Sequence, residues 1–195
     1  MIDLVNNEYQ VFDDLVDVDT QNTIENILFS NTFPWFYNEL SVGESEHYTK
    51  YNHEYYDYIQ MSHVFVRDGV GNSNYCKKIL DRLLQSTKIQ SPVIRCKANL
   101  KFTAPNGNLD SHNKPHYDQE EDHYVGLYYV NDSDGDTWLF DKDEKVKVRV
   151  SPKKGRWLFF RGNLLHAASH PIKKWKRLII NIDFKQWVRQ IIQHT

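Results

Sequence analysis

Two histidines and one aspartate have the types and spacing that most directly indicate chemistry. His116 and Asp118 form the single His-x-Asp/Glu triplet in a sequence with nine histidines. Because side chains two residues apart on an extended backbone point to the same side, both can reach one metal ion. His166, which follows the apolar segment at 157–160, is the candidate for a third ligand. Two imidazoles and one carboxylate form the facial triad that leaves positions open on a ferrous ion.

An arginine eleven residues after His166 is the candidate for binding a carboxylate. Arg177 has a planar fork of donors, which suits a carboxylate better than the ammonium group of a lysine. Lys176 is the competing cation. On a strand, Lys176 shares a face with the apolar residues that follow it, whereas Arg177 shares one with Asn181 and Asp183. This alternation predicts that Arg177, rather than Lys176, faces a pocket. The alternative role for Arg177 is a surface ion pair.

Other histidines compete for these roles. His170 is the rival third ligand, but it precedes a proline in a turn-like stretch, so its ring is expected to face solvent. His112 and His123 flank the triplet without ligand spacing and are expected to support the site or line its rim. The segment at 42–60, rich in Tyr, His and Glu, is expected to form a surface loop or a lid over the substrate.

Short strands must position these residues. Strand patterns cover residues 62–69, 123–130, 137–140, 146–150, 156–160 and 176–184, and residues 92–104 are a candidate pair of strands. Helical patterns cover 20–29, with an Asn or Thr as N-cap, and 73–86, capped by Ser73 or Asn74. Two early helices followed by many strands favour a mostly β fold with flanking helices, built as a sandwich or jelly roll.

Length and composition indicate one globular domain over residues 1–195, with helices mainly in 20–90 and the metal core in 92–185. Hydrophobic residues make up 40% of the 195 residues, and no apolar stretch approaches the roughly 20 residues of a membrane span. The first residues lack a secretory signal pattern. The expected location is therefore the cytoplasm, with reduced cysteines at 76 and 96.

The net charge of −2 conceals an asymmetry along the chain. Residues 1–60 hold twelve Asp/Glu and one Lys, whereas residues 141–195 hold fourteen Lys/Arg and four acids. One interpretation is that the two ends face each other or that each is simply solvated. The other is a basic rim that attracts an anionic partner such as nucleic acid.

Together, these residues resemble the prolyl 4-hydroxylase-like group of the 2-oxoglutarate- and Fe(II)-dependent oxygenases. The family pattern is His-x-Asp, a distal His, and then an Arg or Lys that holds the far carboxylate of 2-oxoglutarate. The segment Leu-His-Ala-Ala-Ser-His-Pro-Ile at 165–172 is similar to the family's Leu-His-x-Val-x-Pro-Val, with one residue added before the proline. The segment Leu-Tyr-Tyr-Val-Asn at 127–131 is similar to the strand with a co-substrate-binding tyrosine, which implies that role for Tyr129. Asn181 falls where some members place a hydroxyl side chain beside the arginine.

The resemblance implies a double-stranded β-helix (jelly roll) that binds Fe(II) through His116, Asp118 and His166. It implies 2-oxoglutarate and dioxygen as co-substrates, ascorbate as a further reductant, and hydroxylation of a prolyl or other peptide side chain or of a small molecule. The compact length is similar to that of phage-encoded members, for which the location is the host cytoplasm. Two alternatives stay open: a catalytically idle jelly-roll module that binds a partner or builds an assembly, and an oxygenase of this superfamily that acts on nucleic acid.

Overall fold

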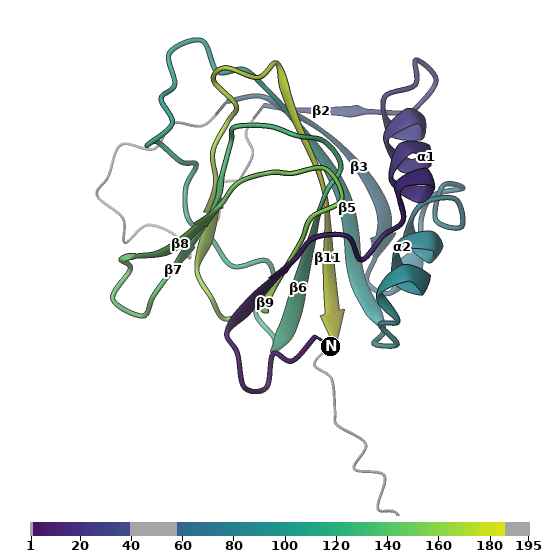
Figure 1. The fold of residues 1–195 in the computed structure, drawn as a ribbon, viewed down its shortest axis with the longest axis horizontal. Coiled ribbons are helices and arrows are strands. Elements are labelled where there is room, and N and C mark those ends of the chain that lie inside the picture. The colour runs from purple at the N-terminus through teal and green to yellow at the C-terminus, as the bar shows by residue number, and fades with distance from the viewer. Residues whose placement is uncertain (1, 40–57, 186–195) are drawn as a thin grey trace, which may run out of the picture.

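The computed structural model describes residues 2–39 and 58–185, which form two β-sheets and two helices in layers (Figure 1). A large sheet lies in the middle, the helices cover one of its faces, and a small sheet lies against the other. The expected mostly β fold with flanking helices is confirmed. Within the described ranges, no helix has the length and apolar character needed to cross a bilayer. The expected loop or lid at 42–60 falls largely outside them.

The large sheet has eight strands in the order β1-β9-β6-β11-β5-β3-β2, with β4 beside β3. Its strands are β1 (Tyr9–Phe12), β2 (Phe36–Asn38), β3 (Gln60–Arg67), β4 (Val70–Gly71), β5 (Val93–Phe102), β6 (His123–Tyr129), β9 (Trp157–Arg161) and β11 (Lys176–Lys185). The small sheet has the order β10-β7-β8, with β7 (Thr137–Phe140), β8 (Val146–Val150) and β10 (His166–Ala168). Every pairing in both sheets is antiparallel.

Strand β5 corrects the prediction of a strand pair at 92–104. It is one ten-residue strand that pairs with β11 on one side and with β3 on the other. Its small and apolar residues Cys96, Ala98 and Leu100 are buried against the helices, so the alternation continues without a turn. The prediction of two strands was wrong, because the polar residues within 93–102 do not interrupt the strand.

Strand β11 separates the two sides of the molecule. Leu178, Ile180 and Ile182 pack toward the helices in the main core, and burying each such side chain contributes about 1.5–3 kcal/mol. The alternate residues Ile179 and Asn181 face the small sheet instead. Both faces of β11 are therefore buried, which explains its near-continuous apolar sequence.

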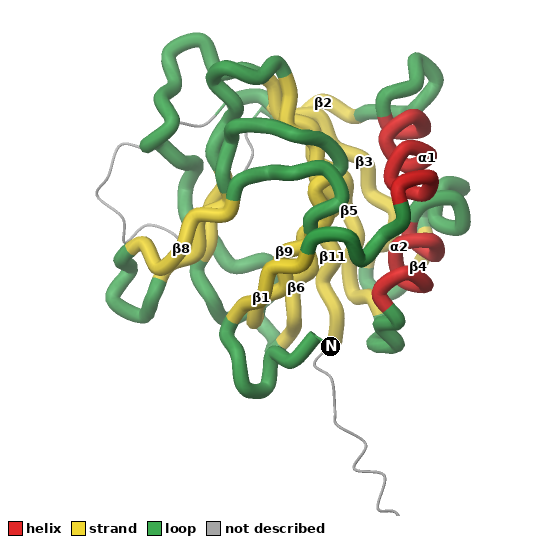
Figure 2. Tube along the Cα trace, viewed as in Figure 1, coloured by secondary structure: helices red, strands yellow, loops and turns green. Residues whose placement is uncertain are grey.

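Both helices lie on the same side of the large sheet (Figure 2). Helix α1 (Val18–Leu28) begins earlier than predicted, because the Asp17 side chain, rather than an Asn or Thr, accepts the capping bond from the backbone N–H of Thr20 at 2.9 Å. Helix α2 (Leu80–Thr87) begins later than predicted. Ser73 caps a turn instead of the helix, because its Oγ accepts from the N–H of Tyr75.

Among the described residues, acids near the N-terminus pair with cations of the C-terminal third, as the first interpretation of the charge asymmetry proposed. Lys153 and Arg156 both pair with Asp13, and Lys154 pairs with Glu25 of α1. Exposed ion pairs of this kind contribute little stability, about 0–1 kcal/mol each. Their consequence is electrostatic, because part of the positive charge of the C-terminal third is neutralised within the chain.

Candidate metal centre and anion pocket

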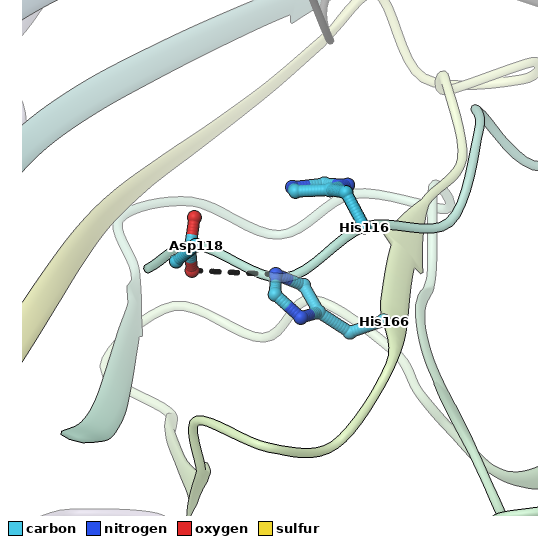
Figure 3. A group of neighbouring side chains, drawn as sticks. All are labelled: His116, Asp118 and His166. Carbon is cyan, nitrogen blue, oxygen red and sulfur yellow. Dashed lines mark ion pairs between the residues drawn. The ribbon is translucent and has the colours of Figure 1, made fainter. Parts of the chain in front are cut away.

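His116, Asp118 and His166 converge on one point (Figure 3). Their ligand atoms all lie within 4.8 Å of one another. His116 and His166 are brought together by a short antiparallel bridge, in which each backbone N–H donates to the carbonyl of the other residue at 2.9 and 3.1 Å. The structure thus brings together the three residues that the sequence proposed as a ligand set, although 50 residues separate the two histidines.

Backbone carbonyls orient both imidazole rings. Nδ1 of His116 lies 3.2 Å from the carbonyl oxygen of Lys114, and Nδ1 of His166 lies 3.3 Å from that of Leu164. A proton on each Nδ1 leaves the lone pair of Nε2 for a metal ion. Burial lowers the pKa of His116 to about 4, and the charge of His166 acts in the same direction. His116 is therefore neutral at pH 7, which is the form that binds metals.

Asp118 is held ionised by its neighbours. Its side chain is 4% exposed, and it pairs with Arg95 through one oxygen and accepts from Nδ2 of Asn181 at 3.1 Å through the other. Burial alone would raise the pKa of Asp118, but Arg95 and His166 outweigh it and hold that pKa well below its ordinary value. Arg95 also donates to Asp183 at 2.7 Å. A donor set of two imidazoles and one carboxylate fits Fe(II).

Arg177 is a buried cation that has no carboxylate partner in the described part of the chain. It is 1% exposed, and its Nε and Nη2 donate to the carbonyl of Gly135 at 2.6 Å and to Oγ1 of Thr137 at 2.7 Å. No described residue offers a hydrogen-bond partner to its Nη1. Burial lowers the pKa of Arg177, yet an arginine stays charged, so the site favours an anion. Arg177 and the metal triad line the same pocket.

The remaining co-substrate candidates occupy different places. Tyr129 is fully buried, and its hydroxyl donates to Oγ1 of Thr137 at 2.7 Å. Arg177 donates to the same oxygen of Thr137, so both side chains are hydrogen-bonded to one residue. Asn181 lies at the metal end of the pocket, because it contacts Asp118. Lys176 points to the helical side, with Nζ 3.3 Å from the centre of the Phe29 ring.

The other histidines lie outside the triad. His170 is 3% exposed, so the expectation that its ring faces solvent is wrong; its Nδ1 lies 3.2 Å from the carbonyl oxygen of Phe102 instead. His112 packs on Trp138, with ring centroids 5.1 Å apart. His123 is buried, with Nδ1 2.7 Å from the carbonyl oxygen of Glu121. None of the three lines the pocket of the triad.

Sequence reasoning missed the polar face of β5. Arg95, Lys97, Asn99 and Lys101 all line the pocket. The signal was present as a strict alternation of polar and apolar residues over 95–102. It was overlooked because alternation predicts only that one face is polar, and a polar face is usually solvated.

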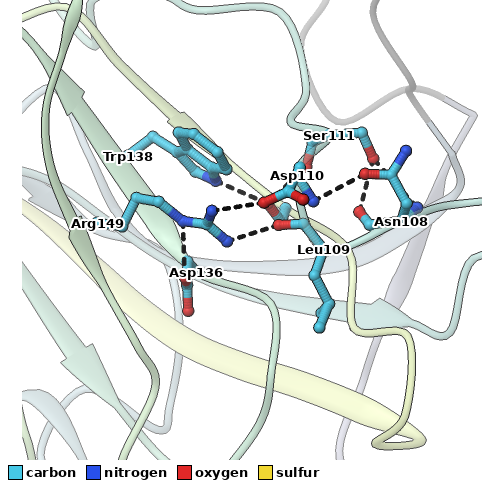
Figure 4. Close-up of polar contacts among 8 residues, drawn as sticks. Asn108, Leu109, Asp110, Ser111, Asp136, Trp138 and Arg149 are labelled. Atoms are coloured by element: carbon cyan, nitrogen blue, oxygen red, sulfur yellow. Dashed lines mark hydrogen bonds and ion pairs between the residues drawn. The ribbon is translucent and has the colours of Figure 1, made fainter.

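Arg149 of β8 fixes the loop that leads from β5 to His116 (Figure 4). Its guanidinium donates to Asp110 at 2.8 Å and to the carbonyl of Leu109 at 2.6 Å within that loop, and to Asp136 at 3.0 Å. The same group lies over the ring of Trp138, 4.0 Å from its centre. Arg149 therefore attaches the loop to the small sheet, a few residues before His116, the first of the metal-ligand candidates.

Replacing Arg149 with methionine is expected to weaken Fe(II) binding about tenfold, because outer-shell partners that orient ligands typically matter by 10–100-fold. Fe(II) affinity and thermal unfolding are the measurements, and Arg149→Lys should recover part of the loss. Lys147→Met is the matched control, because Lys147 lies on the same strand but pairs with Glu8, away from the loop. Lower thermal stability with unchanged iron affinity would contradict a positioning role for Arg149.

No protein-family model and no curated protein matches the sequence, but solved structures match its fold. A 2OG-Fe(II) oxygenase family oxidoreductase from Burkholderia pseudomallei has a TM-score of 0.65 at 11% identity, over 93% of this chain and 87% of that one. A prolyl-4-hydroxylase from Pseudomonas putida has a TM-score of 0.58 at 14% identity, over 95% and 96%.

A viral collagen prolyl hydroxylase from Paramecium Bursaria Chlorella virus-1, solved as a 2OG complex, has a TM-score of 0.54 at 16% identity, over 92% of this chain and 97% of that one. At such low identities, likeness in structure concerns the fold. This chain has the double-stranded β-helix fold that is found in 2-oxoglutarate- and Fe(II)-dependent oxygenases.

Proposed function

We propose that this protein is a 2-oxoglutarate- and Fe(II)-dependent dioxygenase, formed by a single domain over residues 1–195. The observation that carries the proposal is one pocket with a potential metal triad and, at its other end, a buried arginine whose Nη1 has no partner among the described residues. Arg177 and Asn181 lie four residues apart on β11, about 13 Å, so the two ends are separate. The fold neighbours include a viral hydroxylase solved with 2OG, which supports the same co-substrate here.

In this proposal, His116, Asp118 and His166 hold Fe(II), and Arg177 holds the far carboxylate of 2-oxoglutarate. When bound, iron, 2-oxoglutarate and dioxygen together supply the oxidation, in which a substrate C–H bond becomes C–OH while 2-oxoglutarate becomes succinate and carbon dioxide. The protein's residues position these groups. Tyr129 and Arg177 both bond to Thr137, which fixes the anchor, while Arg95 and Asn181 fix the carboxylate of Asp118.

A prolyl or other peptide side chain is the leading substrate, because three of the matched structures are prolyl hydroxylases. A catalytically idle module is less favoured, since it has no need for a buried guanidinium group that lines a pocket and leaves Nη1 unsatisfied among the described residues. An oxygenase for nucleic acid is less favoured too, because acids near the N-terminus pair with several cations of the C-terminal third.

An anaerobic titration of the metal-free protein with Fe(II) and then 2-oxoglutarate tests the proposal. We expect the visible charge-transfer band of a chelated keto acid, which bleaches with formation of succinate when oxygen is admitted. Iron binding without the band would leave a metal site without a co-substrate anchor and would favour the binding-module alternative. If the protein binds no iron at all, His116, Asp118 and His166 do not form a metal site.

A further inference from the structure

The pocket contains more positive charge than the proposed co-substrate accounts for. Four cationic side chains line it, namely Arg95, Lys97, Lys101 and Arg177, whereas Asp118 is the single carboxylate among the described lining residues. The two charges of a metal ion and the two of 2-oxoglutarate would cancel each other. A surplus of cations in a partly enclosed pocket favours a further anion.

The hydrogen bonds of these four cationic side chains identify which of them could bind a further anion. Arg95 pairs with Asp118 and with Asp183, and Nζ of Lys101 donates to Asn113. Lys97 is half-buried, and it has no hydrogen bond or ion pair in the part of the chain that the structure describes. An ammonium group in this position lacks the partner that normally offsets the loss of its hydration.

The register of β5 and β11 places Lys97 at the metal end of the pocket. Lys101 lies opposite Arg177, whereas Lys97 lies opposite Asn181, which contacts the metal-ligand candidate Asp118. An anion at Lys97 is therefore about 13 Å along the strands from the level of the Arg177 anchor. The far carboxylate of 2-oxoglutarate at Arg177 would leave Lys97 unused.

Two amide oxygens beside Lys97 would each accept a hydrogen bond from a ligand. Oδ1 of Asn99 and Oδ1 of Asn181 are buried and have no hydrogen-bond partner within residues 2–39 and 58–185. The Asn181 amide is oriented, because its Nδ2 donates to Asp118. A ligand with an anionic oxygen for Lys97 and an N–H group for a neighbouring acceptor would satisfy both kinds of group.

We propose that Lys97 is a specificity-determining residue that binds a carboxylate of the molecule to be oxidised, which is an amino acid or peptide with an N–H group beside that carboxylate. The inference rests on the proposed oxygenase function, because that function makes the ligand of this subsite a substrate. The 1-carboxylate of 2-oxoglutarate has the same chemistry, and the experiment separates the two sources.

The test compares N-acetylglycine, which has a carboxylate and an N–H group, with N-acetylglycinamide, its uncharged counterpart. Binding is measured by ligand-observed NMR, on metal-free protein and on anaerobic protein loaded with Fe(II) and 2-oxoglutarate. We expect the wild-type protein to prefer the acid about tenfold, which is the contribution of one hydrogen bond to a charged group. Lys97→Met should remove the preference, Lys97→Arg should keep most of it, and Lys142→Met, which removes an exposed cation, should leave it unchanged.

Three results would overturn the inference. One is a wild-type protein without preference for the acid, and another is a preference that survives in Lys97→Met. The third is a Lys97→Met variant whose affinity for 2-oxoglutarate falls in the charge-transfer titration, because Lys97 would then hold the co-substrate. Failure of the oxygenase proposal looks different: the wild-type protein gives no charge-transfer band, whatever its preference between acid and amide.

Discussion

Replacing Asp118 with alanine is expected to lower the affinity for Fe(II) by more than about 100-fold and to abolish metal-dependent turnover. Removal of a proposed direct ligand should exceed the 10–100-fold effect of removing an outer-shell partner. The two remaining ligand candidates are imidazoles, which bring no negative charge to replace that of the carboxylate. Iron affinity of the purified variant, and succinate formation with 2-oxoglutarate present, are the measurements.

The variant should still unfold cooperatively. Arg95, the main ionic partner of Asp118, keeps its 2.7 Å contact with Asp183, so its charge is not left alone. Asp183→Asn is the matched control, because it also removes a buried carboxyl next to Arg95 but not a proposed ligand. We expect the control to bind iron within about tenfold of the wild-type protein. An active Asp118→Ala protein with unchanged iron affinity would show that the triad is wrong.

Replacing Arg177 with methionine is expected to weaken 2-oxoglutarate binding about 100-fold while Fe(II) affinity is retained. Truncating one partner of a buried, hydrogen-bonded charge pair costs about 2–5 kcal/mol, and 2.7 kcal/mol corresponds to 100-fold. Arg177→Lys should give an intermediate loss, because an ammonium group keeps the charge but not the planar fork. The measurement is the charge-transfer band as a function of 2-oxoglutarate concentration.

Lys176→Met is the control for this experiment. The two residues are adjacent on β11, but Lys176 contacts the Phe29 ring on the helical side, so its removal should leave co-substrate affinity unchanged. The opposite pattern, with a loss in Lys176→Met and none in Arg177→Met, would assign the anchor to Lys176. Thermal unfolding of Arg177→Met shows whether Gly135 and Thr137 tolerate the loss of their donor.

The sequence by itself determined the features that depend on local periodicity. The two-residue spacing of His116 and Asp118 places both side chains on one side of the chain. The alternation along 176–184 assigns Lys176 and Arg177 to opposite faces, and the structure places one toward Phe29 and the other in the pocket. The mostly β fold followed from the number of strand patterns. Each of these inferences needs only neighbouring residues, because side-chain direction repeats every two residues on a strand.

Tertiary structure alone decided which distant residues share the pocket. The bridge that joins His116 to His166, the pairing of Arg95 with Asp118, and the polar face of β5 all depend on strand register. It also corrected the exposure of His170, which is buried although it precedes a proline in a turn. Register and burial are set by contacts between residues far apart in the chain. Sequence periodicity could therefore predict the two faces of a strand, but not which face would enclose a site.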